Sequence, residues 1–140
     1  MVFGFISSTV TPPALIFMGE HQVENEKLFK CGDPGDVWFH VDKVSSAHVY
    51  LQLPSGITID TIPEELLEEC CQLVKKNSIQ GVKMEKVEVN YTLKENLKKV
   101  KGMQTGEIGF YDKNIIKSRS VLKKNTKKVL QQLEGTQWKT

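Results

Sequence analysis

Residues 36–53 read DVWFHVDKVSSAHVYLQL, and this stretch decides the fold. Its two ends, residues 37–41 and 47–53, are rich in the β-branched and aromatic side chains that favour strands. The polar segment 42–46 between them predicts a turn, and residues 54–56 (PSG) close the segment. We therefore expect the two strands to pair as a hairpin.

This hairpin brings two histidines together. If the strands pair in this way, His40 and His48 lie close to directly opposite each other, on one face of the sheet. Alternation along the first strand puts Phe39 on the face expected to pack into the core, and Trp38 on the same face as the histidines, here called the histidine face. The histidine face is suited either to a semi-exposed binding surface, on which aromatic rings stack nucleobases, or to packing against a helix. The sequence leaves both interpretations open.

The segments before the hairpin predict strands and a short helix. β-branched and aromatic runs indicate the strands, and residues 32–35 (GDPG) break the helix. We expect strands at 2–10 and 14–18, paired with each other, and a helix at 21–30 with Val23, Leu28 and Phe29 on its apolar side.

The segments after the hairpin contain the clearest helix, at 63–77. Thr61 is its expected N-cap, and Leu66, Cys70, Leu73 and Val74 form its apolar stripe. Beyond it we expect a strand at 87–91, a polar loop at 92–102, a hairpin of 107–111 with 115–121 turning at 112–114, and a helix at 122–133.

This order of elements predicts an α+β fold. We expect a single domain in which a mostly antiparallel, mixed sheet packs against two or three helices. The domain is expected to span residues 1–134, with residues 135–140 as a C-terminal tail. A chain of 140 residues with 39% hydrophobic and 26% charged residues is an ordinary size and composition for one such domain, which excludes wholesale disorder and fibrous repeats.

The net charge of +2 is the sum of an acidic first half and a basic second half. Residues 1–82 carry five lysines and eleven acidic residues, a net charge of −6, whereas residues 83–140 carry fourteen basic and six acidic residues, a net charge of +8. A basic half of this kind is typical of a surface that binds a polyanion. Arg119 is the only arginine, so base-specific readout of a duplex, which relies on the arginine fork, is not expected.

The chain carries no recognised catalytic or metal-binding motif. Cys31, Cys70 and Cys71 lack metal-ligand spacing, and the last two fit the apolar stripe of the helix at 63–77. No H-E-x-x-H, Walker or G-x-G-x-x-G pattern occurs. We therefore expect no catalytic residues, no metal and no cofactor.

The sequence also bears on location. No apolar run approaches the roughly 20 residues that span a membrane. The start MVFGFISSTV lacks the basic region of a secretory signal, and the unpaired cysteines indicate a reducing compartment. We expect an intracellular protein without a membrane span, cytoplasmic or also nuclear.

Several stretches together resemble the NFACT-R domain family in its stand-alone eukaryotic form. The D-x-W-F-H…S-x-H-V combination is the most specific of them. The family commonly continues into a coiled coil, so residues 135–140 are expected to begin a truncated extension of that kind. The matching stretches are DVWFHVDKVSSAHVYLQL at 36–53, NSIQGVKMEKVEVNYT at 77–92, NLKKVKG at 96–102 and TGEIGFY at 105–111, preceded by MVFGFISSTV and MGEHQVENEKL.

The resemblance implies a non-enzymatic module that binds RNA, such as tRNA or rRNA, or single-stranded DNA. Larger relatives belong to ribosome-associated quality control, which implies a ribosomal or coiled-coil protein partner. The residues expected to bind nucleic acid are Trp38, His40, His48, Asn96, Lys98, Lys99 and Lys101, with Lys123, Lys124 and Lys127 of the final helix. The residues expected to act structurally are Asn25, Asp36, Phe39, Ser46, Tyr91, Gly102 and Gly106.

Three functional hypotheses follow. In the first, the lysine loop at 94–101 and the lysines of the final helix follow a phosphate backbone, with the histidine face beside them. In the second, the protein is an RNA-processing enzyme in which His40 and His48 act with Asp36 or Asp42. In the third it is a protein-binding adaptor. The first accounts for both the charge split and the motif match.

Overall fold

The computed structural model describes residues 2–19, 22–99 and 108–139. A seven-stranded sheet in the order β8-β5-β3-β4-β2-β1-β9 forms the centre, and each neighbouring pair is antiparallel. Its strands are β1 (Val2–Ser7), β2 (Ala14–Gly19), β3 (Val37–Val41), β4 (His48–Leu51), β5 (Lys86–Leu93), β8 (Lys117–Leu122) and β9 (Trp138–Lys139).

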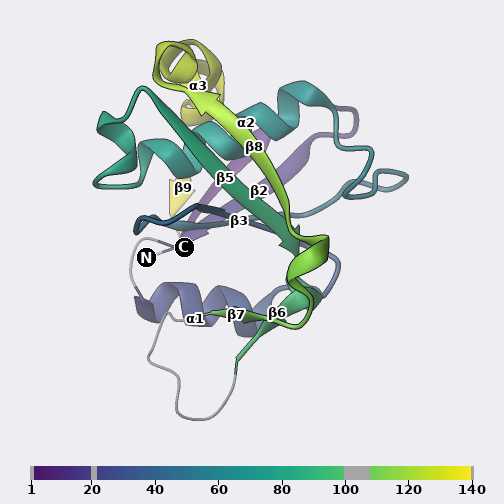
Figure 1. Cartoon of the computed structure of the whole chain (residues 1–140). Coiled ribbons are helices and arrows are strands. Elements are labelled where there is room, and N and C mark those ends of the chain that lie inside the picture. Colours follow the sequence, from purple (N-terminus) through teal and green to yellow (C-terminus); the bar gives the residue numbers. More distant parts are fainter. Residues whose placement is uncertain (1, 20–21, 100–107, 140) are drawn as a thin grey trace.

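Helices lie on both faces of this sheet (Figure 1). Helices α2 (Glu64–Lys76) and α3 (Thr126–Glu134) cover one face, and α1 (Gln22–Cys31) lies on the other together with the small sheet of β6 (Leu97–Lys98) and β7 (Gly109–Phe110). The expected α+β class is confirmed. Four 3-10 turns complete the described elements: η1 (Gly81–Lys83), η2 (Lys94–Asn96), η3 (Lys113–Ile115) and η4 (Lys123–Asn125).

The main core lies between the sheet and helices α2 and α3. Phe39, Leu66 and Leu130 are fully buried in it, and each such side chain contributes about 2 kcal/mol of hydrophobic stabilisation. Cys70 and Cys71 are buried there as expected. A second, smaller cluster on the opposite face joins Trp38, Tyr50 and Leu97 to Leu28, Phe29, Ile108 and Phe110.

The helix starts differ from the sequence expectations. Pro63 precedes α2 without a side-chain cap, and Thr61 instead bonds to Thr58, one turn before the helix. In α1, Val23 is 74% exposed, although it was expected on the apolar side; only the C-terminal part of α1, with Leu28 and Phe29, packs against the small cluster.

The expected hairpin turning at 112–114 is wrong. Strand β7 pairs with β6, and β8 pairs with β5, so the two segments join different sheets. The reason is that Asn96 takes the hydrogen bonds of residues 111 and 112, because its main-chain oxygen accepts from Tyr111 N and its side chain accepts from Asp112 N.

The last residues add to the large sheet. Residues 135–140 were expected as a tail, but Trp138 and Lys139 form β9, which pairs with β1 opposite Gly4 and Phe3. Within the described residues, no helix is both long and apolar enough to cross a membrane.

Candidate nucleic-acid interface

A row of polar side chains runs across four strands on the histidine face. The register pairs Ser118 of β8 with Asn90 of β5, and Asn90 with His40 of β3. One position beyond the pair Phe39–Val49, His40 and His48 come opposite each other, with ring centroids 5.0 Å apart. Within the row, Ser118 Oγ donates to Asn90 Oδ1 (2.8 Å). The expected placement of the two histidines is therefore confirmed.

Two hydrogen bonds fix the protonation of these histidines. Trp38 donates from Nε1 to Nδ1 of His48 at 3.1 Å, so a neutral His48 carries its hydrogen on Nε2. His40 donates from Nδ1 to the Val41 carbonyl at 2.6 Å, which leaves Nε2 of His40 as an acceptor. Among the described residues, neither Nε2 atom has a hydrogen-bond partner.

Both rings are uncharged at neutral pH. Burial lowers the pKa of His48 to about 3, with the nearby His40 and Lys99 adding to the effect. Burial also lowers the pKa of His40, against the opposing influence of its Val41 hydrogen bond and of Asp42. The pair is therefore a neutral donor and acceptor rather than a cationic site.

The histidines line an open pocket of about 450 Å³. Asp42 and Asn90 add polar groups to its wall, and Asn90 Nδ2 donates to Asp42 Oδ1 at 3.0 Å. Trp38 and Phe110 supply aromatic surface, with ring centroids 5.5 Å apart. The pocket thus combines a few polar groups with aromatic walls, as small-ligand sites do.

The histidine face is less exposed than a stacking platform requires. Trp38 and His48 are buried, whereas His40 is half-buried. Part of the face packs against α1 and the β6–β7 sheet, so the helix-packing interpretation applies to Trp38. The expectation of semi-exposure is wrong for Trp38 and His48, and it holds for His40.

Ser46 and Asp36 support the hairpin from its two ends. Ser46 Oγ accepts from Val41 N (3.2 Å) and donates to the Ala47 carbonyl (2.9 Å), which ties the two sides of the turn together. Asp36 lies at the start of β3, where its carboxylate accepts from Asp33 N (3.1 Å). Burial raises the pKa of Asp36.

The carboxylates needed by the enzymatic hypothesis do not join the histidines. Asp36 lies at the opposite end of β3 from His40, and Asp42 bonds to Asn90. Among the described residues, no carboxylate hydrogen-bonds to His40 or His48. In the same part of the chain, no group of three or more His, Cys, Asp or Glu side chains could hold a metal ion.

Three residues expected to act structurally pack inside the domain. Phe39 and Tyr91 stack in the main core, with centroids 5.3 Å apart and an interplanar angle of 20°. Asn25 is buried in α1, where its Oδ1 lies against Gly19.

The lysine loop is only partly free for a ligand. Lys99 forms an ion pair with Glu26 of α1. Lys94 donates to the Gly32 carbonyl (2.7 Å) and lies over the Phe29 ring. Lys98 is exposed. Lys101, expected to bind nucleic acid, and Gly102 and Gly106, expected to act structurally, lie outside the described residues.

Asn96, expected to contact nucleic acid, is buried and holds the backbone of Tyr111. Its Nδ2 donates to Thr92 Oγ1 (3.2 Å) and to the Asp112 carbonyl (2.9 Å), and its main-chain oxygen accepts from Tyr111 N (2.9 Å). The Tyr111 side chain is 69% exposed, with Lys98 Nζ 5.8 Å from the ring centroid. An exposed aromatic ring beside a lysine suits base stacking. Sequence reasoning missed Tyr111, although it lies within the TGEIGFY stretch.

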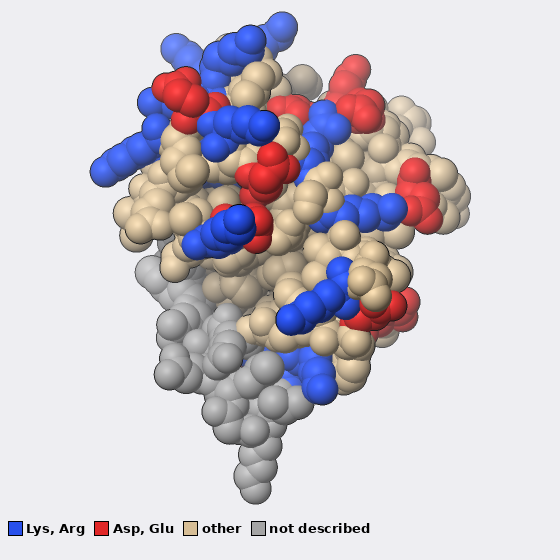
Figure 2. Space-filling view, in the orientation of Figure 1, with Lys and Arg blue, Asp and Glu red and all other residues tan. Residues whose placement is uncertain are grey.

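The lysines of the final helix are exposed. Lys123, Lys124 and Lys127 all face solvent on η4 and α3. The Lys123 amide donates to the Glu85 carbonyl (2.8 Å), which brings the β5 start alongside. Figure 2 shows basic side chains gathered at the top of the molecule, where α3 lies, with a few acidic ones among them. We call the exposed set the α3 lysine cluster: Lys83, Lys86, Lys123, Lys124, Lys127 and Lys128.

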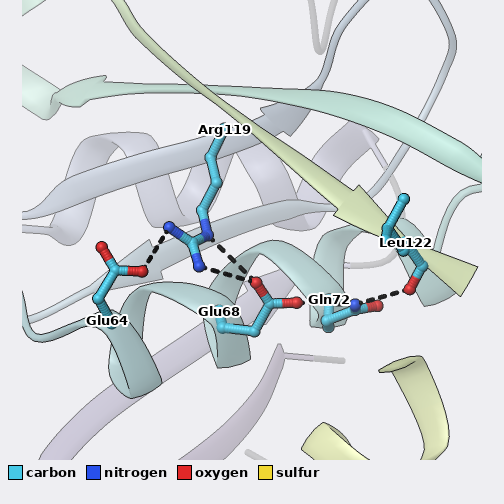
Figure 3. Close-up of polar contacts among 5 residues, drawn as sticks. All are labelled: Glu64, Glu68, Gln72, Arg119 and Leu122. Carbon is cyan, nitrogen blue, oxygen red and sulfur yellow. Dashed lines mark hydrogen bonds and ion pairs between the residues drawn. The ribbon is translucent and has the colours of Figure 1, made fainter. Parts of the chain in front are cut away.

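Arg119 is half-buried and engaged by carboxylates of the same domain. It forms ion pairs with Glu64 (2.9 Å) and Glu68 (3.0 Å) of α2 (Figure 3). Gln72, on the same helix, donates to the Leu122 carbonyl at 3.0 Å. These contacts fasten β8 to α2, so the positive charge left for a polyanion comes from lysines.

The fold and the site together define a small α+β domain with a lysine-rich surface and a neutral histidine pocket, a combination typical of ligand-binding modules. A family model described as NFACT protein RNA binding domain matches residues 1–112. The chain belongs to this family, which confirms the resemblance seen in the sequence.

Named relatives agree with this assignment. The chain is 52% identical over 136 residues to coiled-coil domain-containing protein 25 of Danio rerio, covering 97% of this chain and 65% of that protein. It is 45% identical over 130 residues to the Dictyostelium discoideum homolog, covering 93% of this chain and 63% of that protein. It is 46% identical over 101 residues to Protein JLP2 of Saccharomyces cerevisiae, covering 70% of this chain and 49% of that protein.

A solved structure shares the fold. The C-terminal part of the fibronectin/fibrinogen-binding protein from Streptococcus suis superposes with a TM-score of 0.71 at 17% identity, covering 93% of this chain and 47% of that one. At this identity the likeness concerns the fold alone.

Proposed function

We propose that this domain is a non-enzymatic RNA-binding module. The observation that carries the proposal is the family assignment, combined with the exposed lysines of the second half of the chain. Phosphate neutralisation by such lysines supplies most of the affinity of non-specific nucleic-acid binding.

The α3 lysine cluster is the main phosphate-binding surface in this proposal. Lys123, Lys124 and Lys127 are exposed, and no ion pair engages them among the described residues. Lys98 is a second contact, whereas Lys99 contributes less because Glu26 neutralises it. This distribution favours the final helix over the lysine loop as the stronger of the two phosphate-binding regions.

Single-stranded RNA fits the surface better than a duplex. Tyr111 presents an exposed ring beside Lys98, which suits an unpaired base next to its phosphate. The single arginine is engaged by Glu64 and Glu68, so the bidentate contact that reads guanine in a duplex is missing among the described residues. Single-stranded DNA shares these features and is the alternative ligand.

We further propose that the RNA is tRNA or rRNA, and that the domain acts in ribosome-associated quality control with a ribosomal or coiled-coil partner. The sequence resemblance to larger proteins of that pathway supports this step. It implies a cytoplasmic protein, with some molecules in the nucleus.

The test is charge reversal on the α3 lysine cluster. Fluorescence anisotropy measures the affinity of the purified chain for a labelled single-stranded RNA of about 20 nucleotides. Lys123→Glu, Lys124→Glu and Lys127→Glu combined should weaken binding by at least about tenfold at 0.1 M salt.

A matched triple variant controls for net charge. Lys27 and Lys30 are exposed on α1, on the other face of the sheet from α3, and Lys139 is exposed on β9, at the sheet edge opposite β8. Their reversal to glutamate changes the net charge equally and should weaken binding by about threefold or less, as long-range charge alone would. Equal losses in the two triple variants would contradict the assigned surface. Binding to ribosomes that survives complete nuclease treatment would instead support a protein-binding adaptor.

A further inference from the structure

The Nε2 atoms of the two histidines have opposite hydrogen-bonding roles, one as a donor and the other as an acceptor. Trp38 donates to His48 Nδ1, which leaves His48 a donor at Nε2, and Val41 accepts from His40 Nδ1, which leaves His40 an acceptor at Nε2. The rings lie 5.0 Å apart with an interplanar angle of 82°. The chain has thus fixed one donor and one acceptor on two neighbouring rings that line the same pocket.

We propose that this pocket holds the edge of one unpaired nucleobase, with His48 Nε2 donating to the base and His40 Nε2 accepting from it. The proposal rests on the RNA-binding function proposed above and assigns a subsite within it. Nucleobases present a donor next to an acceptor along one edge, as adenine does with its amino group and N7. Unpaired bases in RNA are commonly read along such edges.

The walls of the pocket fit a flat, uncharged ligand. Trp38 and Phe110 provide aromatic surface, and Ile108 adds an aliphatic side. The volume of about 450 Å³ lies within the range of small-molecule sites and leaves room for a base.

Electrostatics disfavour a phosphate in the same place. Neither imidazole carries a charge, and Asp42 adds a carboxylate to the wall. Lys43 lines the pocket but is exposed to solvent, and Lys99, whose charge acts on His48, is paired with Glu26. A phosphate would gain little from these groups, whereas a neutral base edge satisfies both Nε2 atoms.

The supporting contacts hold the pair in place before a ligand arrives. Ser46 ties the strand ends at Val41 and Ala47, and Trp38 is itself buried against Tyr50. The ordering cost on binding therefore falls on the RNA rather than on the protein. The D-x-W-F-H…S-x-H pattern is explained by this arrangement, because Trp38 and Ser46 act as positioning residues for the two imidazoles.

The test compares the binding of an RNA oligomer that carries bases with that of the same oligomer without them. The full chain, labelled with ¹⁵N, is titrated with a short single-stranded RNA, with the same oligomer carrying abasic riboses, and with inorganic phosphate. Long-range ¹H–¹⁵N spectra report the imidazole nitrogens of His40 and His48 directly. We expect the Nε2 signals of both residues to shift with the base-containing RNA, and to stay in place with the abasic oligomer and with phosphate.

The affinities of the His40→Ala variant for the two oligomers complete the test. His40→Ala should weaken binding of the base-containing RNA by about 5- to 100-fold, the range for a two-point base contact, and leave the abasic oligomer within about twofold. Asn114→Ala, an exposed polar change in η3, should leave both affinities unchanged.

The outcomes separate the two proposals. If the wild-type chain binds RNA but its Nε2 signals respond equally to the abasic oligomer, or stay fixed with all ligands, the pocket is not a base site and the RNA-binding proposal survives. If the wild-type chain binds none of the oligomers, both proposals fail together. The spectra of the unmodified chain decide the question even where His40→Ala does not fold.

Discussion

Trp38 and His48 are joined across β3 and β4 by a hydrogen bond of 3.1 Å from the indole Nε1 to the imidazole Nδ1. Both side chains are buried, so the bond sets the tautomer of His48 in a region that water reaches poorly. Because His48 faces His40 at 5.0 Å, the same bond determines what the pocket offers a ligand.

Replacing this donor should cost stability. Trp38→Phe keeps an aromatic ring but leaves Nδ1 of His48 without its partner, and an unsatisfied buried acceptor costs about 1–3 kcal/mol. Urea unfolding measures the change in the free energy of unfolding. The ¹⁵N spectrum of His48 should show the two neutral tautomers, with the hydrogen on Nδ1 or on Nε2, in exchange with each other.

The matched control is Tyr50→Phe. Tyr50 lies opposite Trp38 on β4, and its buried hydroxyl has no hydrogen-bond partner among the described residues. Removing that hydroxyl should leave the free energy of unfolding unchanged or slightly higher. A loss as large as that of Trp38→Phe would mean that the indole N–H is not the source of the effect.

Acid should destabilise the domain through His48. Its pKa is about 3 in the folded state against 6.5 for the free side chain, so between these values only the unfolded state binds the proton. The free energy of unfolding therefore falls as the pH falls through this window, by up to about 1.4 kcal/mol per pH unit.

Urea unfolding at about pH 7 and about pH 5 measures this slope. His48→Gln should flatten it, and the difference between the two chains isolates His48 from Glu69, whose raised pKa acts in the opposite direction. Parallel pH profiles for both chains would show that His48 titrates as it does in water.

Gly4 should tolerate no side chain. A Cβ there would lie 2.3 Å from the indole of Trp138, which crosses β1 from β9. Gly4→Ala should cost about 1–3 kcal/mol by overpacking. Gly35→Ala meets nothing within 4 Å and should stay within about 0.5 kcal/mol of wild type. The cost at Gly4 should vanish in a Trp138→Ala background; a cost that persists there would refute the steric cause.

Tyr111 should contribute to RNA affinity through its ring. Tyr111→Ala should weaken binding of single-stranded RNA by about 5- to 100-fold, whereas Tyr111→Phe should keep most of the affinity because the ring remains. Anisotropy measures both. Equal losses in the two variants would point to the hydroxyl instead, and no loss in either would remove Tyr111 from the interface.

The local parts of the fold could be predicted from the sequence. The register that pairs His40 with His48 follows from strict alternation on both sides of a short polar turn, and the α2 stripe follows from apolar residues three or four apart. These signals depend on neighbours within a few residues, so they need no knowledge of the rest of the chain.

The features that depend on residues distant in the sequence could not be predicted from it. The cover over Trp38 includes Leu97 and Phe110, which lie far from it in the sequence. The pairing of Lys99 with Glu26 spans 73 residues. Tyr111 gave no signal as a ligand-facing ring, because its exposure depends on how Asn96 holds the backbone at residue 111.

The central claim is that lysines bind an RNA backbone, and the salt dependence of affinity tests it most directly. The dissociation constant of the unmodified chain for single-stranded RNA is measured between about 50 and 200 mM salt. We assume one phosphate contact for each of four lysines: Lys98, Lys123, Lys124 and Lys127. The logarithm of the association constant should then fall with the logarithm of the salt concentration, with a slope of about −3. A slope near zero, or no binding at the lowest salt, would contradict the account.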